Sequence, residues 1–406
     1  MPSLRIFGAA VGAVAAVVIS ASPAAAAQPP TLTWHKQTLW RSFSTTDPAT
    51  GATLTTCFRL PAVVKTKNNV LLAFAERRNR NCADHGAFDI VMRRSTDNGL
   101  TWEASKTVLA STTGAILQGN ATLVADSTGP VFLFTTSEPT ATQTTPRTPK
   151  VQVSRDDGRT WSAPRDLTGD IKAPAGAGDW FATGPGHGIQ LTRGANAGRL
   201  VVPVYYAVGS TQSVRLVYSD DHGETWQIGA TATYDKSFLK LGEQTIVERT
   251  DGSILVIARN GAVPDDHTST RGMARGLSKD GGLTFDGDFR ADSAIIAPPT
   301  HPALLRQRWD GGPYTRILLS APATPKTDNN AVGMNVRSSF DEGATWRNYD
   351  NSTNNAGVRI DNDHAGYSEM TLIGNGAIGV LYEAGAVRFR DEIRWNWFWE
   401  SAIGLR

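Results

Sequence analysis

Three arginines stand out by their local sequence. Arg59 lies in the tetrapeptide Phe-Arg-Leu-Pro, Arg259 ends the apolar run Ile-Leu-Val-Ile-Ala-Arg, and Arg337 lies two residues before an octapeptide that recurs along the chain. Arginine suits the binding of a carboxylate, because its planar fork forms two parallel hydrogen bonds and stays charged at any working pH. Each could instead be a surface cation paired with an acid, and Arg271 and Arg275 compete with Arg259 because they also precede an octapeptide. The sequence therefore offers a candidate site for an acidic ligand.

A phenol and two carboxyl groups could supply nucleophilic and proton-transfer chemistry. Tyr367 lies in His-Ala-Gly-Tyr-Ser-Glu, Glu243 in Gly-Glu-Gln, and Asp84 in the loop 77–87 between two strand-like runs. A tyrosine becomes a nucleophile when a nearby base takes its proton. A carboxylic acid on a loop over a pocket can protonate a leaving group if its surroundings raise its pKa. Three residues are the alternatives for these roles: Tyr382, Glu248 and Asp89.

The sequence contains no recognisable metal-binding or phosphate-binding motif. His85 and His187 are isolated histidines, and no His-Glu-x-x-His spacing accompanies either of them. The glycine-rich stretch 184–188 opens no helix, so it lacks the setting of a phosphate-binding loop. We therefore expect no catalytic metal and no cofactor.

The balance of charges excludes two classes of partner. The 406 residues include 40 Lys and Arg and 38 Asp and Glu, which gives a formal net charge of +2. The basic residues are scattered among acids, whereas proteins that bind nucleic acids or anionic membranes concentrate positive charge. Any basic site in this chain should be local.

The first 27 residues have the pattern of a secretory signal peptide: a basic start, an apolar run at 6–19 and small residues up to Ala27. The run is too short for a membrane span, and a buried N-terminal helix would need an amphipathic period that is absent. We expect cleavage near Ala27 and a secreted protein. In an oxidising compartment Cys57 and Cys82 could form a disulfide or remain buried thiols, and the sequence leaves both open.

An octapeptide of the form Ser-x-Asp-x-Gly-x-Thr-(Trp/Phe) recurs five times, with starts 59, 65, 59 and 61 residues apart. The Asp can accept hydrogen bonds from the turn backbone, and the Gly supplies a positive φ, so each copy predicts a hairpin turn. The near-constant period suits one four-stranded sheet per repeat. The five copies begin at Ser95, Ser154, Ser219, Ser278 and Ser339.

Strand-like runs lie before and between the octapeptides, and nothing longer than a turn reads as helix. The run 378–382 has no octapeptide after it, so the sequence beyond the fifth copy supplies most of a sixth blade. A strand near 31–43 could close the ring, which would leave few exposed sheet edges. We predict an all-β fold, a six-bladed β-propeller, formed by residues 28–406 as a single domain.

The octapeptides and the Phe-Arg-Leu-Pro motif resemble those of bacterial and animal sialidases, and the resemblance covers essentially the whole chain after the signal peptide. In that family three arginines from different blades hold the carboxylate of sialic acid, and the resemblance gives these roles to Arg59, Arg259 and Arg337. It also places Arg78 where a further arginine supports the acid loop or touches the substrate. We expect these four residues to bind substrate.

The same resemblance makes Asp84 the acid, Tyr367 the nucleophile and Glu243 the base that accepts the tyrosine's proton. A neutral phenol suits this substrate, because the carboxylate beside the anomeric carbon would repel a carboxylate nucleophile. The implied function is that of a monomeric, retaining exo-α-sialidase acting on sialylated glycans. Four aromatic residues could line further subsites or belong to the core: Trp180, Phe181, Tyr205 and Tyr206.

Two other functions remain open. The same site could transfer sialic acid to a sugar acceptor or form an anhydro product by intramolecular attack. Alternatively, the chain could be a non-catalytic propeller that binds acidic glycans.

Overall fold

The protein is described by a computed structural model. The structure describes residues 35–112, 117–139, 146–172, 180–208, 211–234, 239–262, 272–295, 297–307, 316–322, 331–347, 357–373 and 377–404. The predicted signal peptide at 1–27 lies outside these ranges. None of the helices in the described ranges is long and apolar enough to cross a membrane.

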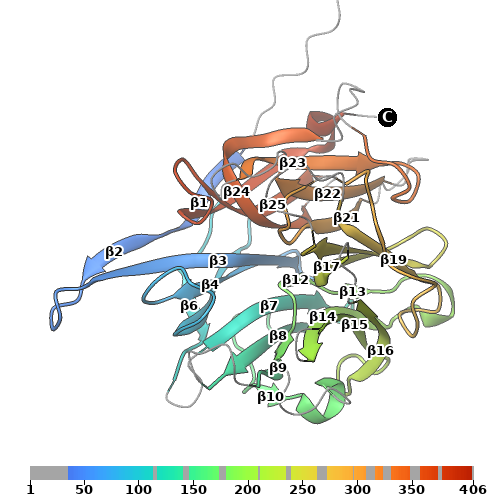
Figure 1. Ribbon diagram of the computed structural model, residues 1–406, viewed down its shortest axis with the longest axis horizontal. Helices are drawn as coiled ribbons and strands as arrows, with labels where there is room; N and C mark the ends of the chain where they lie inside the picture. Colours follow the sequence, from blue (N-terminus) through green and yellow to red (C-terminus); the bar gives the residue numbers. More distant parts are fainter. Residues whose placement is uncertain are drawn as a thin grey trace, which may run out of the picture. The chain divides into compact units, whose positions relative to one another are not determined.

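Almost all regular structure in these ranges is antiparallel sheet (Figure 1). The first sheet, β2-β3-β4-β5-β6, contains β2 (Phe43–Thr46), β3 (Thr53–Lys65), β4 (Leu71–Arg78), β5 (Phe88–Ser95) and β6 (Lys106–Leu109). The second, β10-β9-β8-β7-β12, contains β7 (Leu117–Ala125), β8 (Val131–Glu138), β9 (Thr148–Ser154), β10 (Arg165–Asp166) and β12 (Gly186–His187). The third, β11-β14-β15-β16, contains β11 (Trp180–Ala182), β14 (Leu200–Val208), β15 (Thr211–Ser219) and β16 (Gln227–Tyr234), with β13 (Ile189–Gln190) paired to β14.

The fourth sheet, β17-β18-β19-β20, contains β17 (Leu241–Glu248), β18 (Ile254–Asn260), β19 (Ala274–Ser278) and β20 (Arg290–Ala291). The last sheet, β1-β26-β25-β24-β23-β22-β21, contains β1 (His35–Arg41), β21 (Ala303–Gln307), β22 (Arg316–Pro322), β23 (Ala331–Ser339), β24 (Val358–Ile373), β25 (Ala377–Gly385) and β26 (Glu392–Trp399). Three short helical turns complete the regular structure of the described ranges: η1 (Thr168–Lys172), η2 (Gly194–Asn196) and η3 (Glu400–Ile403).

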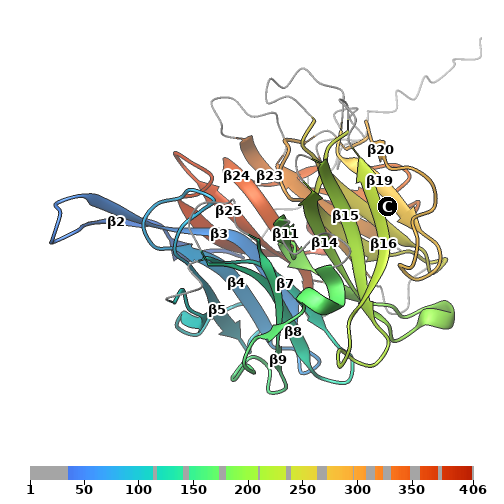
Figure 2. The same cartoon turned by 60° about the horizontal axis from the view of Figure 1, so that its bottom comes forward.

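The long strand β24 belongs to two blades. Its first half pairs with β23 and its second half pairs with β25, so the seven-stranded sheet consists of two four-stranded blades that share one strand. The N-terminal strand β1 pairs with the C-terminal strand β26 and completes the last blade. Six blades therefore follow one another, and Figure 2 shows them in chain order from β3–β5 through β14–β16 to β23–β25.

Apolar cores join neighbouring blades. Leu381 and Trp395 of the last blade pack with Leu39 of β1 and with Val63 and Leu71 of the first blade. Equivalent cores join the first blade to the second, the second to the third, the third to the fourth, and the fourth to β21 and β22. The last blade thus packs on the first, as the predicted six-bladed propeller requires.

The octapeptides form the predicted turns. In the first copy the carboxylate of Asp97 accepts hydrogen bonds from Thr101 N at 2.9 Å and from Thr101 Oγ1 at 2.5 Å. Gly99 has φ 82° and donates its N–H to Ser95 Oγ at 2.8 Å. Four further aspartates make the same contacts: Asp156, Asp221, Asp280 and Asp341. Each octapeptide therefore stabilises one hairpin through hydrogen bonds within the turn.

Each blade has an octapeptide end and an opposite end. The strands β5, β9, β15, β19 and β23 all end at the serine that begins an octapeptide. In the first blade, Leu71 pairs with Ser95 at the octapeptide end, and Arg78 pairs with Phe88 at the opposite end. The position of a residue along its strand therefore decides at which end of the blade it lies.

Replacing Asp156 by alanine should lower the free energy of unfolding by about 1 kcal/mol at pH 7, because Asp156 accepts hydrogen bonds from Thr160 and Ser154. Slight burial raises the pKa of Asp156, but these hydrogen bonds outweigh it and lower the pKa to about 2. The stabilisation is present above the unfolded-state pKa and is lost as pH falls through about 2. Urea unfolding of the parent and the variant at pH 7 and at about pH 2 measures the loss of stability.

Arg155→Ala is the control, because Arg155 is exposed and its 3.4 Å ion pair with Glu224 lies at the surface. It should change the stability by less than about 0.5 kcal/mol. Equal losses for the two variants would contradict the role assigned to the aspartate.

Candidate active site

A cavity of about 970 Å³ opens at the blade ends opposite the octapeptides. Its lining includes Arg59 of β3 and Arg78 of β4, at the end of the first blade where Phe88 begins β5. Glu243 of β17 and Tyr367 of β24 line it from later blades. Side chains from separate blades converge on one space large enough for a small-molecule ligand.

The lining is strongly basic. Seven basic side chains face three acidic ones, whereas the whole chain has a net charge of +2. The basic residues are Arg59, Arg78, Arg147, Lys240, Arg259, Arg388 and Arg390, and the acidic residues are Glu76, Asp84 and Glu243. The expectation that any basic site would be local is confirmed. Such a cavity attracts an anionic ligand.

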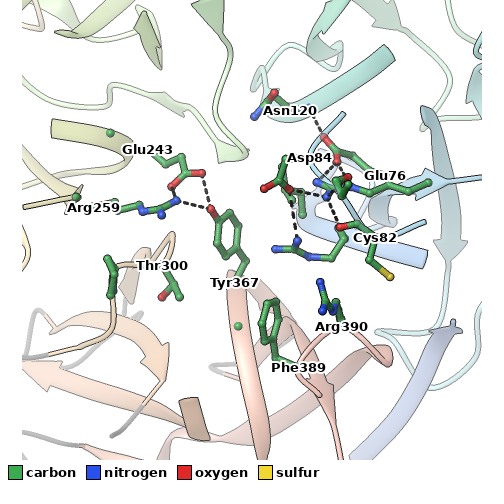
Figure 3. A pocket seen from close by; sticks show the side chains of 18 of the residues that line it. Glu76, Cys82, Asp84, Asn120, Glu243, Arg259, Thr300, Tyr367, Phe389 and Arg390 are labelled. Carbon is green, nitrogen blue, oxygen red and sulfur yellow. Dashed lines mark hydrogen bonds and ion pairs between the residues drawn. The ribbon is translucent and has the colours of Figure 1, made fainter. Parts of the chain in front are cut away.

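Tyr367, Glu243 and Arg259 form a closed hydrogen-bonded triangle (Figure 3). The Tyr367 hydroxyl donates to Glu243 Oε1 at 2.5 Å, and Arg259 Nη1 donates to Glu243 Oε2 and to the Tyr367 oxygen, both at 2.9 Å. Burial raises the pKa of Tyr367 well above its ordinary value, while Arg259 opposes the shift. The resting tyrosine is therefore a neutral phenol, with a carboxylate in contact to take its proton as the oxygen reacts.

Glu383 holds Arg59 and Tyr367 in position. It is fully buried and accepts hydrogen bonds from Arg59 Nε at 2.6 Å and from the backbone N–H groups of Leu60 and Tyr367 at 3.0 and 3.1 Å. Burial opposes the charge on Arg59, but the Glu383 carboxylate outweighs it and raises the pKa of Arg59 above its ordinary value. One carboxylate thus orients a cation of the first blade and the phenol of the last.

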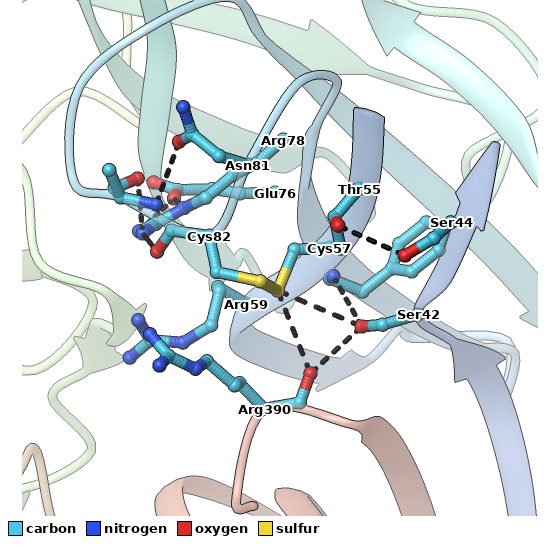
Figure 4. Close-up of a disulfide and its surroundings, with 12 residues drawn as sticks. Ser42, Ser44, Thr55, Cys57, Arg59, Glu76, Arg78, Asn81, Cys82 and Arg390 are labelled. Atoms are coloured by element: carbon cyan, nitrogen blue, oxygen red, sulfur yellow. Dashed lines mark hydrogen bonds and ion pairs between the residues drawn. A yellow bond between two sulfur atoms is a disulfide. The ribbon is translucent and has the colours of Figure 1, made fainter. Parts of the chain in front are cut away.

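The loop that carries Asp84 is fixed by Arg78 and by a disulfide. Arg78 Nη1 donates to Asp84 Oδ1 at 2.6 Å and to the Cys82 carbonyl at 3.1 Å, while its other nitrogens bind Glu76. Cys57 of β3 and Cys82 form a disulfide with their Cα atoms 5.3 Å apart, which settles the pairing that the sequence left open (Figure 4). The loop is therefore attached to two strands of the first blade.

Asp84 itself is 73 % exposed at the mouth of the cavity. The partial burial that it has raises its pKa, but the guanidinium groups of Arg78 and Arg59 outweigh this and lower the pKa below its ordinary value. The expectation of an acid with a raised pKa is therefore wrong for the free protein. In this state Asp84 is an ionised carboxylate at neutral pH.

Comparison of the sequence with known proteins identifies its family. Residues 69–380 match the BNR repeat-like domain family. A sialidase of Micromonospora viridifaciens is 31 % identical over 366 residues, covering 85 % of this chain and 52 % of that protein. An exo-alpha-sialidase of Aspergillus fumigatus is 32 % identical over 360 residues, covering 80 % of this chain and 78 % of that protein. The chain belongs to the sialidase family.

Solved structures of sialidases share the propeller fold. The Hadza microbial sialidase Hz136 superposes with a TM-score of 0.72 at 22 % identity, covering 86 % of this chain and 66 % of that one. The intramolecular trans-sialidase from Ruminococcus gnavus gives a TM-score of 0.70 at 18 % identity, covering 86 % and 96 %. The predicted six-bladed β-propeller is confirmed. The chain spans about half the length of the Micromonospora relative.

Six of the seven residues that the sialidase resemblance selected line the cavity: Arg59, Arg78, Asp84, Glu243, Arg259 and Tyr367. Arg337 does not lie with them. It is fully buried outside the cavity lining, and burial alone lowers its pKa to about 10. The placement of Arg337 in the substrate site is therefore corrected.

The position of Arg337 along β23 explains the correction. The strand ends at Ser339, the start of an octapeptide, and Arg337 lies two residues from that end. Six residues of extended chain, about 20 Å, separate it from the opposite end of the strand at Ala331. An arginine from β23 could have reached the cavity from that opposite end, but residues 331–336 of the strand contain no Lys or Arg.

The alternatives for the tyrosine and the base lie elsewhere. Tyr382 is fully buried and donates its hydroxyl to Asp361 at 2.7 Å. Glu248 accepts hydrogen bonds from the backbone N–H groups of Thr192 and Arg193. Neither lines the cavity.

The alternatives for the acid and the second arginine are also engaged outside the cavity. Asp89 accepts two hydrogen bonds from Arg77 at 2.7 and 3.0 Å. Arg275 Nη1 donates to the Gly343 carbonyl at 2.6 Å. Arg271 lies outside the described residues.

The aromatic and histidine candidates divide between cavity and core. Trp180 and Tyr205 line the cavity, whereas Phe181 and Tyr206 belong to the core shared by the second and third blades. His187 does not line the cavity, and its ring binds Glu369 at 2.8 Å. His85 is exposed and also lies outside the lining. Within the described ranges no group of three His, Cys, Asp or Glu side chains is arranged to hold a metal ion.

No local sequence pattern marks Glu383, because its role depends on contacts across 324 residues of chain. Glu383→Gln should lower the free energy of unfolding by about 3 kcal/mol, because it removes the buried counter-charge of the Arg59 guanidinium. Chemical denaturation measures the loss. Asp286→Asn, which removes one partner of the exposed Lys279–Asp286 ion pair, should cost less than about 0.5 kcal/mol. A Glu383→Gln variant as stable as this control would contradict the assignment.

Proposed function

We propose that this protein is an exo-α-sialidase that hydrolyses terminal sialic acid residues from sialylated glycans with retention of configuration. The observation that carries the proposal is the contact between the buried Tyr367 phenol and Glu243, with Arg259 bound to both, in a cavity rich in guanidinium groups. Membership of the sialidase family and the sialidase relatives support the same activity.

The substrate's carboxylate explains why the cavity is basic. Sialic acid carries this group on the anomeric carbon, so a site that binds it needs cations next to the nucleophile. The Arg59 guanidinium lies 5.6 Å from the centre of the Tyr367 ring, and Arg259 touches the Tyr367 oxygen. Both arginines can therefore hold the carboxylate while the anomeric carbon faces the phenol.

Asp84 protonates the glycosidic oxygen in the first step. Its pKa is low in the free protein because Arg78 and Arg59 face it. A bound carboxylate neutralises part of this positive charge, and the glycan excludes water from the mouth, so binding raises the pKa of Asp84. Substrate binding thus gives Asp84 the raised pKa that a proton donor needs.

The Tyr367 oxygen attacks the anomeric carbon as Glu243 takes the phenol proton and the bond to the leaving oxygen breaks. The glycan leaves with the proton from Asp84, and sialic acid remains bound to Tyr367 through its anomeric carbon. Asp84, now a carboxylate, deprotonates a water molecule that attacks the same carbon. Glu243 returns its proton to the Tyr367 oxygen as that bond breaks, and two inversions give overall retention.

Two further proposals concern the location and the oligomeric state of the protein. We propose that the protein is secreted after removal of residues 1–27 and that it acts as a monomer. The disulfide between Cys57 and Cys82 supports an oxidising destination.

One relative is named for a different product, so a product other than free sialic acid is the second outcome to test. An anhydrosialidase of Macrobdella decora is 29 % identical over 269 residues, covering 60 % of this chain and 30 % of that protein. Proton NMR of the first product separates the cases. Free sialic acid of the substrate's configuration supports hydrolysis, whereas an anhydro sugar or a sialylated acceptor supports transfer. The absence of any turnover supports a glycan-binding propeller.

Tyr367→Phe should lower kcat/KM for a fluorogenic sialoside by more than about 100-fold, because it removes the nucleophilic oxygen and leaves the ring in place. Tyr382→Phe is the matched control: it also removes a buried hydroxyl, the one bound to Asp361, but lies outside the cavity. It should lower stability and leave kcat/KM within about twofold. Near-full turnover by Tyr367→Phe would discard the proposed nucleophile.

The pH dependence of kcat/KM should differ from that of kcat. Asp84 must be protonated to act, so activity falls as pH rises above its pKa. The profile of kcat/KM reports the free enzyme, where Arg78 and Arg59 lower this pKa, and the profile of kcat reports the complex, where it is higher. The alkaline limb of kcat/KM should therefore lie at lower pH than that of kcat. Coincident limbs would contradict the proposal that substrate raises the pKa.

A further inference from the structure

The turn between β25 and β26 contributes Arg388, Phe389 and Arg390 to the cavity lining. Asp391 closes the turn, because its carboxylate accepts the N–H of Arg388 at 2.9 Å and its own N–H donates to the Arg388 carbonyl at 3.1 Å. The Arg390 carbonyl accepts a hydrogen bond from Ser42 Oγ at 2.8 Å. The backbone that presents these side chains is therefore fixed on both sides.

Arg390 and its neighbour Arg388 differ from the four other arginines of the cavity. Arg59, Arg78, Arg147 and Arg259 each form an ion pair with a buried glutamate. No ion pair or hydrogen bond among the described residues involves the side chain of Arg390. Its guanidinium is a cation of the cavity that the protein itself leaves available.

Arg390 also faces like charge. Figure 4 shows its side chain running beside that of Arg59 into the same space. Partial burial lowers the pKa of Arg390, and repulsion from Arg59 and Arg388 lowers it further, although Asp391 and Asp84 oppose this. Phe389 stacks on Arg59, with 5.1 Å between the guanidinium carbon and the ring centre, and holds it toward the same space. Convergent guanidinium groups repel one another until an anion lies between them.

The arginine that the sialidase resemblance selected on β23 does not line the cavity. Arg337 lies at the octapeptide end of β23, and the described residues 331–336 of the strand contain no Lys or Arg. We propose that Arg390 binds the substrate carboxylate together with Arg59 and Arg259, in the role that the sialidase resemblance gave to Arg337. The turn 386–391 is then the element that selects ligands with a free carboxylate. This inference rests on the proposed sialidase function.

The test is Arg390→Gln, with KM, kcat and the inhibition constant of free N-acetylneuraminic acid measured at low and moderate salt. Losing a charge-assisted hydrogen bond should raise KM and the inhibition constant by about 10- to 100-fold, with a smaller change in kcat. Arg390→Lys keeps the charge without the planar fork, so it should recover part of the loss. Inhibition by the methyl ester of the same sugar should be nearly equal in the parent and Arg390→Gln, because the ester carries no charge.

Arg41→Gln is the matched control. Arg41 is 72 % exposed and pairs with Glu392 just beyond the turn, and it does not line the cavity. It should leave KM within about twofold, and thermal unfolding checks that all variants are folded.

A KM for Arg390→Gln within twofold of the parent, or equal losses for the acid and its methyl ester, would overturn the role of Arg390. A parent that hydrolyses no sialoside would instead refute the proposed function. In that case calorimetric titration of N-acetylneuraminic acid into the parent and Arg390→Gln still tests the anion site.

Discussion

The hydrogen bond between the Tyr367 hydroxyl and Glu243 is the interaction on which the proposed chemistry depends. It joins a phenol of β24 to a carboxylate of β17 across 124 residues of sequence, at 2.5 Å. No local element can bring these groups together. The contact exists because blades pack on one another in order and β1 completes the last blade beside β26. The Asp-rich octapeptides matter to the site through the hairpins that they stabilise, although they lie at the opposite end of each blade.

Buried glutamates offset the energetic cost of placing several arginines around one cavity. Glu383 neutralises Arg59, Glu76 neutralises Arg78, Glu138 neutralises Arg147, and Glu243 neutralises Arg259. Buried cations without such partners would be costly. Pairing also fixes the direction of each guanidinium, so that a carboxylate meets donors that are already oriented.

The exposed carboxylate of Asp84 differs from the buried glutamates, because it lies at the mouth of the cavity. Two arginines keep it ionised in the free protein, and the disulfide and Arg78 hold its loop close to the cavity. A group held in this way responds to the charge of what binds next to it. In the proposed mechanism, substrate recognition and acid catalysis are therefore coupled through the same guanidinium groups.

The sequence by itself determined the fold, because the octapeptide turn is a local structure whose hydrogen bonds lie within eight residues. It also supplied the candidates for the site, since the resemblance to sialidases selected Arg59, Asp84, Glu243, Arg259 and Tyr367. Only the tertiary structure decided which end of a strand each side chain reaches, which removed Arg337 from the site and brought in Arg390 and Glu383. The reason is physical: a strand moves about 3.3 Å per residue, so proximity to a motif does not fix proximity to the cavity. Pairings between blades are set by packing, which no local pattern records.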